Sequence, residues 1–478
     1  MPSSDQELIP FCGDSRPSVY ADQGQQRNIN RYPVIEGDQV YLYPTPGMDL
    51  ISTVGSYVPG EGCRGIYTFE GVGYCVMGKK FYSFDINGAA TFRGNLRAST
   101  NPVVMSCNGN QIFVTDGITA YNFDLGNNSW SEVTDYDYDG GSTHSAYISG
   151  FTVVTIPGSD QFALSNALDS SAWEGNIASA EASGDYLVAP LVANDTLFLM
   201  GTETTEQYRF TGAADFPLEK IDGSIIEYGC AAPYTIAKTR DSFVFLAKNK
   251  NAGAELIQFR TGTIKPILNQ YYTDRISRWA RVDDAIGFSY VQSGHEFYVL
   301  TSPSADVTFV YDFTTEMCHE RSSYLNMNYR RWRPTGHIFM GNKQIVGVHD
   351  NNNLYELKLD YYTEYGSPIK RVRRSQLYNS NNNQLTVYKF QINYETDYTN
   401  TDGTGDTPVS TIRYSTDGGH TWSNDLTSPI GSPGNFNDQA IWHCLGSGRK
   451  WVVEEEFNMP YKSVILGATA RYSIESDQ

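Results

Sequence analysis

The sequence predicts an all-β fold, and three observations lead to this prediction. The chain of 478 residues contains 43 Gly, 34 Tyr and 23 Phe, an excess of turn formers and of aromatic residues that favour strands. Helical periodicity is nearly absent. What recurs instead is a hairpin unit, in which an alternating apolar stretch leads through a Gly, Asn or Asp turn into an aromatic strand that often ends in Asp.

The hairpin units repeat at a nearly regular spacing. One aromatic or apolar residue marks each unit: Tyr82, Tyr121, Phe162, Tyr208, Ile257, Phe309 and Tyr355. Successive marks lie 39, 41, 46, 49, 52 and 46 residues apart. A period of roughly 40–50 residues with hairpin content is typical of β-propeller blades, which must stack around an axis because one blade cannot cover its own faces. We therefore expect six or seven blades; the alternative is an irregular array of β-sandwiches.

This interpretation divides the chain into three parts. Residues 1–60 are an N-terminal arm or platform part, residues 61–370 the propeller, and residues 371–478 an additional β platform domain. The basic run Lys370–Arg374 is interpreted as the linker into that last part, since alternating strands resume from Leu385.

The composition excludes several classes of protein. With 40% hydrophobic residues, 19% charged residues and a formal net charge of −19, the chain is neither a disordered segment nor a broad binder of nucleic acid. No apolar run reaches the roughly 18–20 residues that a membrane helix needs, and Met1–Pro10 has no basic and apolar secretion signal. The seven scattered cysteines are expected to be reduced thiols.

The most distinct local motif is an Asp-box, S-x-D-x-G-x-T-W. Its residues are Ser415, Asp417, Gly419, Thr421 and Trp422. The Asp carboxylate can accept backbone N–H groups within a tight turn, the glycines permit positive φ, and the Trp can bury against the hairpin. Sialidases carry such boxes away from their chemistry. A sialidase would also need an arginine cluster and a Tyr/Glu nucleophile pair, so we interpret this box as a structural turn.

Positive charge is concentrated in two places, and three interpretations of it stay open. The residues are Arg330, Arg331 and Arg333 in the first, and Lys370, Arg371, Arg373 and Arg374 in the second. They are candidates for facing DNA phosphates, for pairing across a subunit interface in an otherwise acidic protein, or for a solvated face.

No active site, cofactor site or metal site is predicted. Glu454–Glu456 is a candidate carboxylate pair, but a solvent face with a salt-bridge partner accounts for it better. The pair Cys318-His319 lacks a second ligand pair nearby. Neither a phosphate-binding loop nor a Ser/His/Asp spacing occurs, and we expect a protein that is not an enzyme.

Segments spread over residues 60–475 carry a family resemblance. They are Thr204–Gly212, Ala214–Ile221, Ile226–Tyr234, Gly294–Leu300, Val310–Asp312, His319–Arg321, the Asp-box, Ile441–Gly446 and Leu466–Ala468. In this order and spacing the chain resembles the packaged-DNA stabilisation proteins, also called tail hub or nozzle proteins, of short-tailed bacteriophages. The N-terminal 30 residues match this pattern less clearly.

The resemblance implies a structural protein of the virion tail. It implies a β-propeller with an added β platform, built in part by the two termini, and a homohexamer that closes the portal channel, retains packaged double-stranded DNA and conducts it at genome ejection. Implied partners are the portal and its adaptor ring, the tail fibre or spike and the needle, with assembly in the host cytoplasm and no membrane insertion. The alternatives are a sialidase-like propeller that binds or cleaves glycans, and a cytosolic propeller scaffold.

Overall fold

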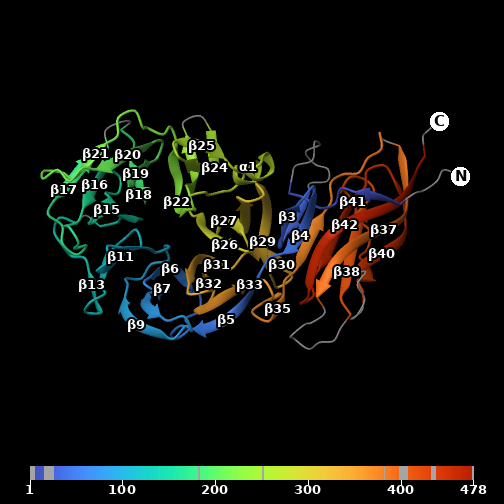
Figure 1. Ribbon diagram of the computed structural model, residues 1–478, viewed down its shortest axis with the longest axis horizontal. Helices are drawn as coiled ribbons and strands as arrows, with labels where there is room; N and C mark the ends of the chain where they lie inside the picture. The colour runs from blue at the N-terminus through green and yellow to red at the C-terminus, as the bar shows by residue number, and fades with distance from the viewer. Residues whose placement is uncertain are drawn as a thin grey trace.

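The computed structural model describes residues 6–15, 26–138, 140–180, 184–249, 252–381, 383–397, 407–431 and 438–475. Strands dominate this part of the chain, and one short helix, α1 (Gln270–Ile276), occurs in it. The strands form a propeller and a neighbouring β-sandwich, hereafter the platform (Figure 1).

The propeller has seven blades among the described residues, and in six of them the four main strands of the antiparallel sheet follow one another in the chain. Blade 1 holds β6 (Cys63–Phe69), β7 (Val72–Met77), β8 (Lys80–Phe84) and β9 (Ala90–Asn95). Blade 2 holds β10 (Val104–Cys107), β11 (Gln111–Thr115), β12 (Ala120–Asp124) and β13 (Ser129–Glu132). Blade 3 holds β14 (Ser145–Ile148), β15 (Phe151–Thr155), β16 (Gln161–Leu164) and β17 (Asn176–Ser179). Blade 4 holds β18 (Leu187–Ala193), β19 (Thr196–Gly201), β20 (Thr205–Phe210) and β21 (Leu218–Lys220).

The last three blades continue the pattern. Blade 5 holds β22 (Gly229–Lys238), β23 (Phe243–Asn249), β24 (Ala252–Arg260) and β25 (Thr263–Pro266). Blade 6 holds β26 (Ile286–Gln292), β27 (His295–Ser302), β28 (Val307–Asp312) and β29 (Met317–Leu325), with β30 (Asn328–Arg331) paired to β29. Blade 7 holds β31 (Pro334–Met340), β32 (Lys343–Val348), β33 (Asn353–Lys358) and, from the N-terminal part of the chain, β5 (Gly47–Thr53).

The propeller is closed, which confirms the predicted fold class. The first strands of the blades contact one another in a ring, from β6 through β10, β14, β18, β22 and β26 to β31 and back to β6. The seven residues that marked the sequence repeat, Tyr82 to Tyr355, all lie on the third strand of their blades. The repeat was visible because each blade must present the same face to its neighbour.

The middle strands of the blades are buried on both faces. In β11 the run Ile112–Val114 is fully buried, and Tyr298–Leu300 in β27 is equally so. A strand covered on both faces carries a continuous apolar run rather than an alternating one. Two-residue turns with positive φ join first and second strands, as at Glu70-Gly71 and Ser293-Gly294, where the hairpin geometry requires left-handed backbone.

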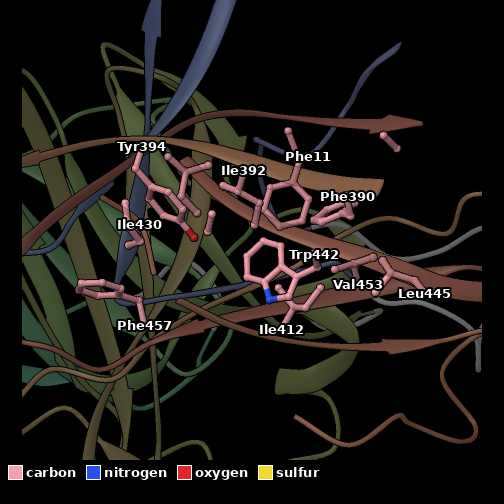
Figure 2. Close-up of a cluster of buried hydrophobic side chains, with 14 of the residues drawn as sticks. Phe11, Phe390, Ile392, Tyr394, Ile412, Ile430, Trp442, Leu445, Val453 and Phe457 are labelled. Carbon is pink, nitrogen blue, oxygen red and sulfur yellow. The ribbon is translucent and has the colours of Figure 1, made fainter. Parts of the chain in front are cut away.

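The platform packs two sheets face to face. The first has the order β3 (Arg31–Glu36), β4 (Gln39–Pro44), β42 (Lys462–Glu475), β37 (Gln384–Asp397) and β40 (Gln439–Gly448), with β1 (Gln6–Ile9) also paired to β42. The second has the order β2 (Arg27–Ile29), β36 (Arg371–Arg374), β41 (Val452–Phe457), β38 (Val409–Ser415) and β39 (Leu426–Pro429). Figure 2 shows the core between the sheets, where Phe390 and Trp442 of the first sheet meet Ile412 and Val453 of the second. Each such side chain stabilises the fold by about 1.5–3 kcal/mol on burial.

One continuous sheet joins the two parts. Strand β2 pairs in parallel with β29 of blade 6 and antiparallel with β36, so the blade runs directly into the second platform sheet. The predicted basic linker at Lys370–Arg374 is therefore wrong: most of this run is β36, an interior strand. Two short strands, β34 (Thr363–Glu364) and β35 (Ser367–Pro368), extend blade 7 beside this junction. The predicted domain boundaries themselves stay a prediction.

Candidate functional site

Two of the predicted basic residues, Arg371 and Arg373, are buried inside the protomer, with 0% and 1% of their surface exposed. Arg373 donates from Nε to the carbonyl of Phe11 at 2.7 Å and from Nη1 to that of Asp14 at 3.2 Å. Arg373 thus holds the N-terminal segment against β36. Neither guanidinium lies on the protomer surface.

Arg371 belongs to a buried charged cluster behind the sheet. It donates from Nη1 to the carbonyls of Ile369 and Met459, both at 3.4 Å, and burial lowers its pKa to about 9. Arg31 beside it pairs with Glu455 at 2.9 Å, and both of these side chains are fully buried. The middle residue of the Glu454–Glu456 run therefore points into the core, where burial raises its pKa.

The arginines of the first predicted cluster are engaged within blade 6 and blade 7. Arg330 pairs with Asp306 at 3.0 Å on the surface, and Arg333 pairs with Asp350 at 2.8 Å and is nearly buried. Arg331 is half-buried, and burial lowers its pKa. Their predicted role toward DNA or another subunit stays a prediction.

The remaining predicted cations, Lys370 and Arg374, lie in a groove of about 280 Å³ on the outer face of the second platform sheet. We call it the basic groove. Two arginines that the sequence analysis missed, Arg27 of β2 and Arg413 of β38, also line it. Its charged lining residues are Arg27, Lys370, Arg374, Arg413, Asp425, Glu454 and Glu456.

Strand register creates the basic groove. Arg27 lies opposite Arg374, Arg374 opposite Glu454, and Glu454 opposite Arg413, so one row across four strands carries three cations and one carboxylate. Side chains directly opposite each other on neighbouring strands lie close enough to interact. The sequence signals were the basic run with Lys370 and Arg374 and the alternation Glu454–Glu456, which puts the two outer carboxylates on one face.

Glu454 is shared by two guanidiniums. Arg374 donates to its Oε2 at 2.6 Å and Arg413 donates to its Oε1 at 2.7 Å from Nε, while 9% of the Glu454 side chain is exposed. Both guanidiniums also lie over the ring of Trp422, at 5.1 and 4.9 Å from its centroid. The Asp-box tryptophan thus packs on the cations of the basic groove as well as on its own turn.

A second shared carboxylate, Glu320 of β29, lies behind Arg27. It accepts from Arg27 Nη2 at 3.0 Å and from Arg275 Nη1 at 2.7 Å, and only 5% of its side chain is exposed. Burial alone would raise the pKa of this carboxyl, but the two arginines lower it to about 2. Lys370 pairs more simply with Glu456 at 2.8 Å, and its ammonium lies 4.5 Å from the ring centroid of Tyr324.

The Asp-box residues lie in a tight turn held by the Asp417 carboxylate. Asp417 accepts from the backbone N–H of His420 and of Thr421, both at 2.9 Å, and from the hydroxyls of Thr421 at 2.6 Å and Ser415 at 2.7 Å. Burial opposes ionisation, but these hydrogen bonds hold the pKa of the carboxyl well below its usual range. Gly419 has a φ of +102° and donates its N–H to Ser415 Oγ at 2.8 Å. Asp417 has both oxygens committed to the turn.

A larger cavity, about 530 Å³, lies along the propeller axis between the first strands of the blades. Its polar residues bond within the chain: Arg64 pairs with Asp116 at 2.9 Å, and the hydroxyls of Ser106 and Ser145 are 2.7 Å apart. In the described ranges, no three His, Cys, Asp or Glu side chains are grouped so as to hold a metal ion. No helix there is long and apolar enough to span a membrane.

The closed propeller and the platform sandwich define a β-propeller protein with an appended β domain. The family model described as "Bacteriophage P22 Gp10, beta-propeller" matches residues 9–362, well over half of the chain. The chain belongs to this family of phage structural proteins, which confirms the resemblance found in the sequence.

Similar solved structures are distant. A protein described as a hybrid two component system, BT4673 from B. thetaiotaomicron, has an extracellular domain with a TM-score of 0.43 and 10% identity, covering 82% of this chain and 47% of that one. The chain thus spans about half of that structure. The WD40 domain of Neurospora crassa Pan2 gives a TM-score of 0.42 and 7% identity, covering 66% of this chain and 96% of that domain. No curated protein matches the chain.

Proposed function

We propose that the chain is the tail hub, or nozzle, of a short-tailed bacteriophage. Six copies form a ring below the portal and its adaptor ring, close the channel, retain the packaged double-stranded DNA and conduct it at infection. The ring sits in the virion tail, is assembled in the host cytoplasm, and also contacts the tail fibre or spike and the needle. It performs no catalysis.

The family match over residues 9–362 carries this proposal. The continuous sheet from β26 to β39 supports it, because a protomer whose two parts share backbone hydrogen bonds can transmit force from one ring to the next without hinge motion. The fully buried Arg31–Glu455 pair links the two sheets of the platform, β3 of the first to β41 of the second.

The charge of the chain supports passage of DNA rather than its capture. Six copies carry a formal charge of about −114. Each DNA phosphate that a cationic side chain of the channel wall neutralises releases counterions, which raises the affinity of the wall for DNA. A channel that must release DNA quickly is therefore best lined by acidic or neutral side chains. Arg330 and Arg331 are candidates for a narrow basic band in such a channel.

The test is assembly on the portal complex. The purified chain is mixed with a portal–adaptor complex from the same phage, and the product is followed by light scattering and negative-stain imaging. A closed ring of six copies with a central hole on the adaptor supports the proposal. A chain that stays a monomer in the presence of the portal complex contradicts it.

A further inference from the structure

Acidic and basic side chains are paired differently in the basic groove than at other exposed ion pairs of the protein. At Arg209–Glu219, Arg260–Asp241 and Arg281–Asp283, one exposed arginine meets one exposed acid. Around the groove, Glu454 and Glu320 each serve two arginines.

The sharing leaves a local surplus of positive charge. Arg27, Arg275, Lys370, Arg374 and Arg413 stand against Glu320, Glu454, Glu456 and Asp425, a surplus of one cation in a chain of net charge −19. The bonds to Glu454 use Nε and Nη2 of Arg374 and of Arg413, and 26% and 42% of the two side chains are exposed. Part of each side chain is therefore accessible at the groove mouth.

These cations are also fixed in position before any partner arrives. Arg374 and Arg413 are held by Glu454 on one side and by the Trp422 ring on the other, and Lys370 is held by Glu456 and the Tyr324 ring. Side chains that are already ordered lose less conformational entropy on binding. Ordered, partly exposed guanidiniums are suited to bind a carboxylate in a fixed geometry.

The shape and the floor of the groove favour a single carboxylate over a nucleic acid. A volume of about 280 Å³ holds one or two side chains, not a duplex. Duplex DNA carries a charge about every 1.7 Å of its axis, and the carboxylates of Glu454, Glu456 and Asp425 at the lining would repel such a continuous row. One isolated acid can fit between them.

We infer that the basic groove receives an acidic side chain from a neighbouring copy of this chain. The inference rests on the proposed ring, and charge complementarity points to the same partner: with 54 acidic against 35 basic residues, a second copy carries a large excess of acidic side chains. The groove is then the cationic half of a head-to-tail contact, in which different surfaces of two copies meet. Glu454 and the incoming carboxylate share Arg374 and Arg413 between them.

The experiment compares Arg413→Gln with a matched control, Arg209→Gln, whose arginine is also an exposed partner of one glutamate. Ring formation on the portal–adaptor complex is titrated for the wild type and both variants at about 50 mM and about 500 mM salt, a range over which the screening length falls severalfold. For Arg413→Gln we expect ring formation weakened about tenfold or more at low salt, with a smaller salt dependence than the wild type. Arg209→Gln matches the wild type.

A second measurement does not depend on the variant. A carbodiimide couples an amine directly to a carboxylate, and the wild-type ring should yield an intermolecular product joining Lys370 to an acidic residue of another copy. Rings of Arg413→Gln equal to those of the wild type, together with no such product, overturn the inference and leave the proposed function standing. Loss of duplex DNA binding in Arg413→Gln with unchanged rings assigns the groove to phosphate and also overturns it. A wild type that never forms a ring overturns both proposals.

Discussion

Replacing Glu320 by Gln tests the charge network that joins blade 6 to the platform. The Glu320 carboxylate is almost fully buried and accepts from Arg27 and Arg275 at 3.0 and 2.7 Å. The amide keeps the shape of the side chain but leaves two partly exposed guanidiniums without their counter-ion. Because solvent screens these two cations in part, we expect a cost at or below the about 3–5 kcal/mol that follows when a fully buried ion pair is broken.

The pKa of Glu320 gives the pH range of this effect. Its folded-state value of about 2 lies below the ordinary value of 4.5, a difference that corresponds to about 3 kcal/mol of stability. Because the folded-state pKa is lowered, this stability is fully present above about pH 5 and is lost as the pH falls toward 2. The difference between wild type and Glu320→Gln should therefore be large at pH 7 and shrink steadily below pH 5.

The assay is urea denaturation of both proteins at several pH values from 7 to 3, compared as differences in the free energy of unfolding. Histidines and other carboxyls titrate in both proteins, so their contributions cancel in the difference. The control is Glu219→Gln, since Glu219 pairs with Arg209 on the surface and should cost less than about 0.5 kcal/mol. A Glu320→Gln cost no larger than that of the control, or one that does not change with pH, would refute the role given to Glu320.

Three further predictions follow from other sites. Asp417→Ala should lower the free energy of unfolding by about 1–3 kcal/mol in urea titrations, because the Asp-box turn loses its acceptor; a variant that folds normally but loses glycan cleavage shown by the wild type would contradict the structural role. His319→Leu should raise stability at pH 7 by about 1 kcal/mol, because neither ring nitrogen of His319 has a partner in the described structure. Burial lowers the pKa of His319 to about 3, so the wild type should also lose more stability than this variant between pH 6.5 and 4; equal pH slopes would be the contrary result. The free protein should bind duplex DNA no tighter than about 10⁻⁴–10⁻⁶ M at physiological salt in a mobility-shift titration, and nanomolar binding would show a DNA clamp instead.

The propeller could be predicted because its signal is local and repeated. Each blade is built from consecutive hairpins, so the spacing from Tyr82 to Tyr355 records the blades directly. The sequence could not show that β5 is the last strand of blade 7. Gly47–Thr53 pairs with a strand some three hundred residues away, and nothing in its own sequence indicates that partner.

The Asp-box turn was predictable for the same local reason, since its donors and acceptors lie within seven residues of one another. The basic groove was not. Arg27 and Arg413 are isolated in the sequence, and they join Arg374 only through the register of β2, β36, β41 and β38. The run of charged residues at Arg371 and Arg373 suggested an exposed segment, because charged residues this close together usually lie on a surface. Here they are alternate residues of an interior strand, and their side chains point into the junction.

The N-terminal part of the chain explains why the propeller and the platform cannot be separated at any one boundary. Strand β5 completes blade 7, β3 and β4 belong to the first platform sheet, and β2 lies between blade 6 and β36. A chain begun near residue 60 would leave blade 7 without its outer strand, and a chain ended at residue 362, where the family match stops, would leave β2 without β36 and β4 without β42. Because unpaired strand edges invite aggregation, neither fragment is a sound test of the ring. The N-terminal segment thus supplies β5, which completes blade 7, and Arg27 of β2, which lines the basic groove, so closure of the protomer and the inferred contact between copies both depend on this segment.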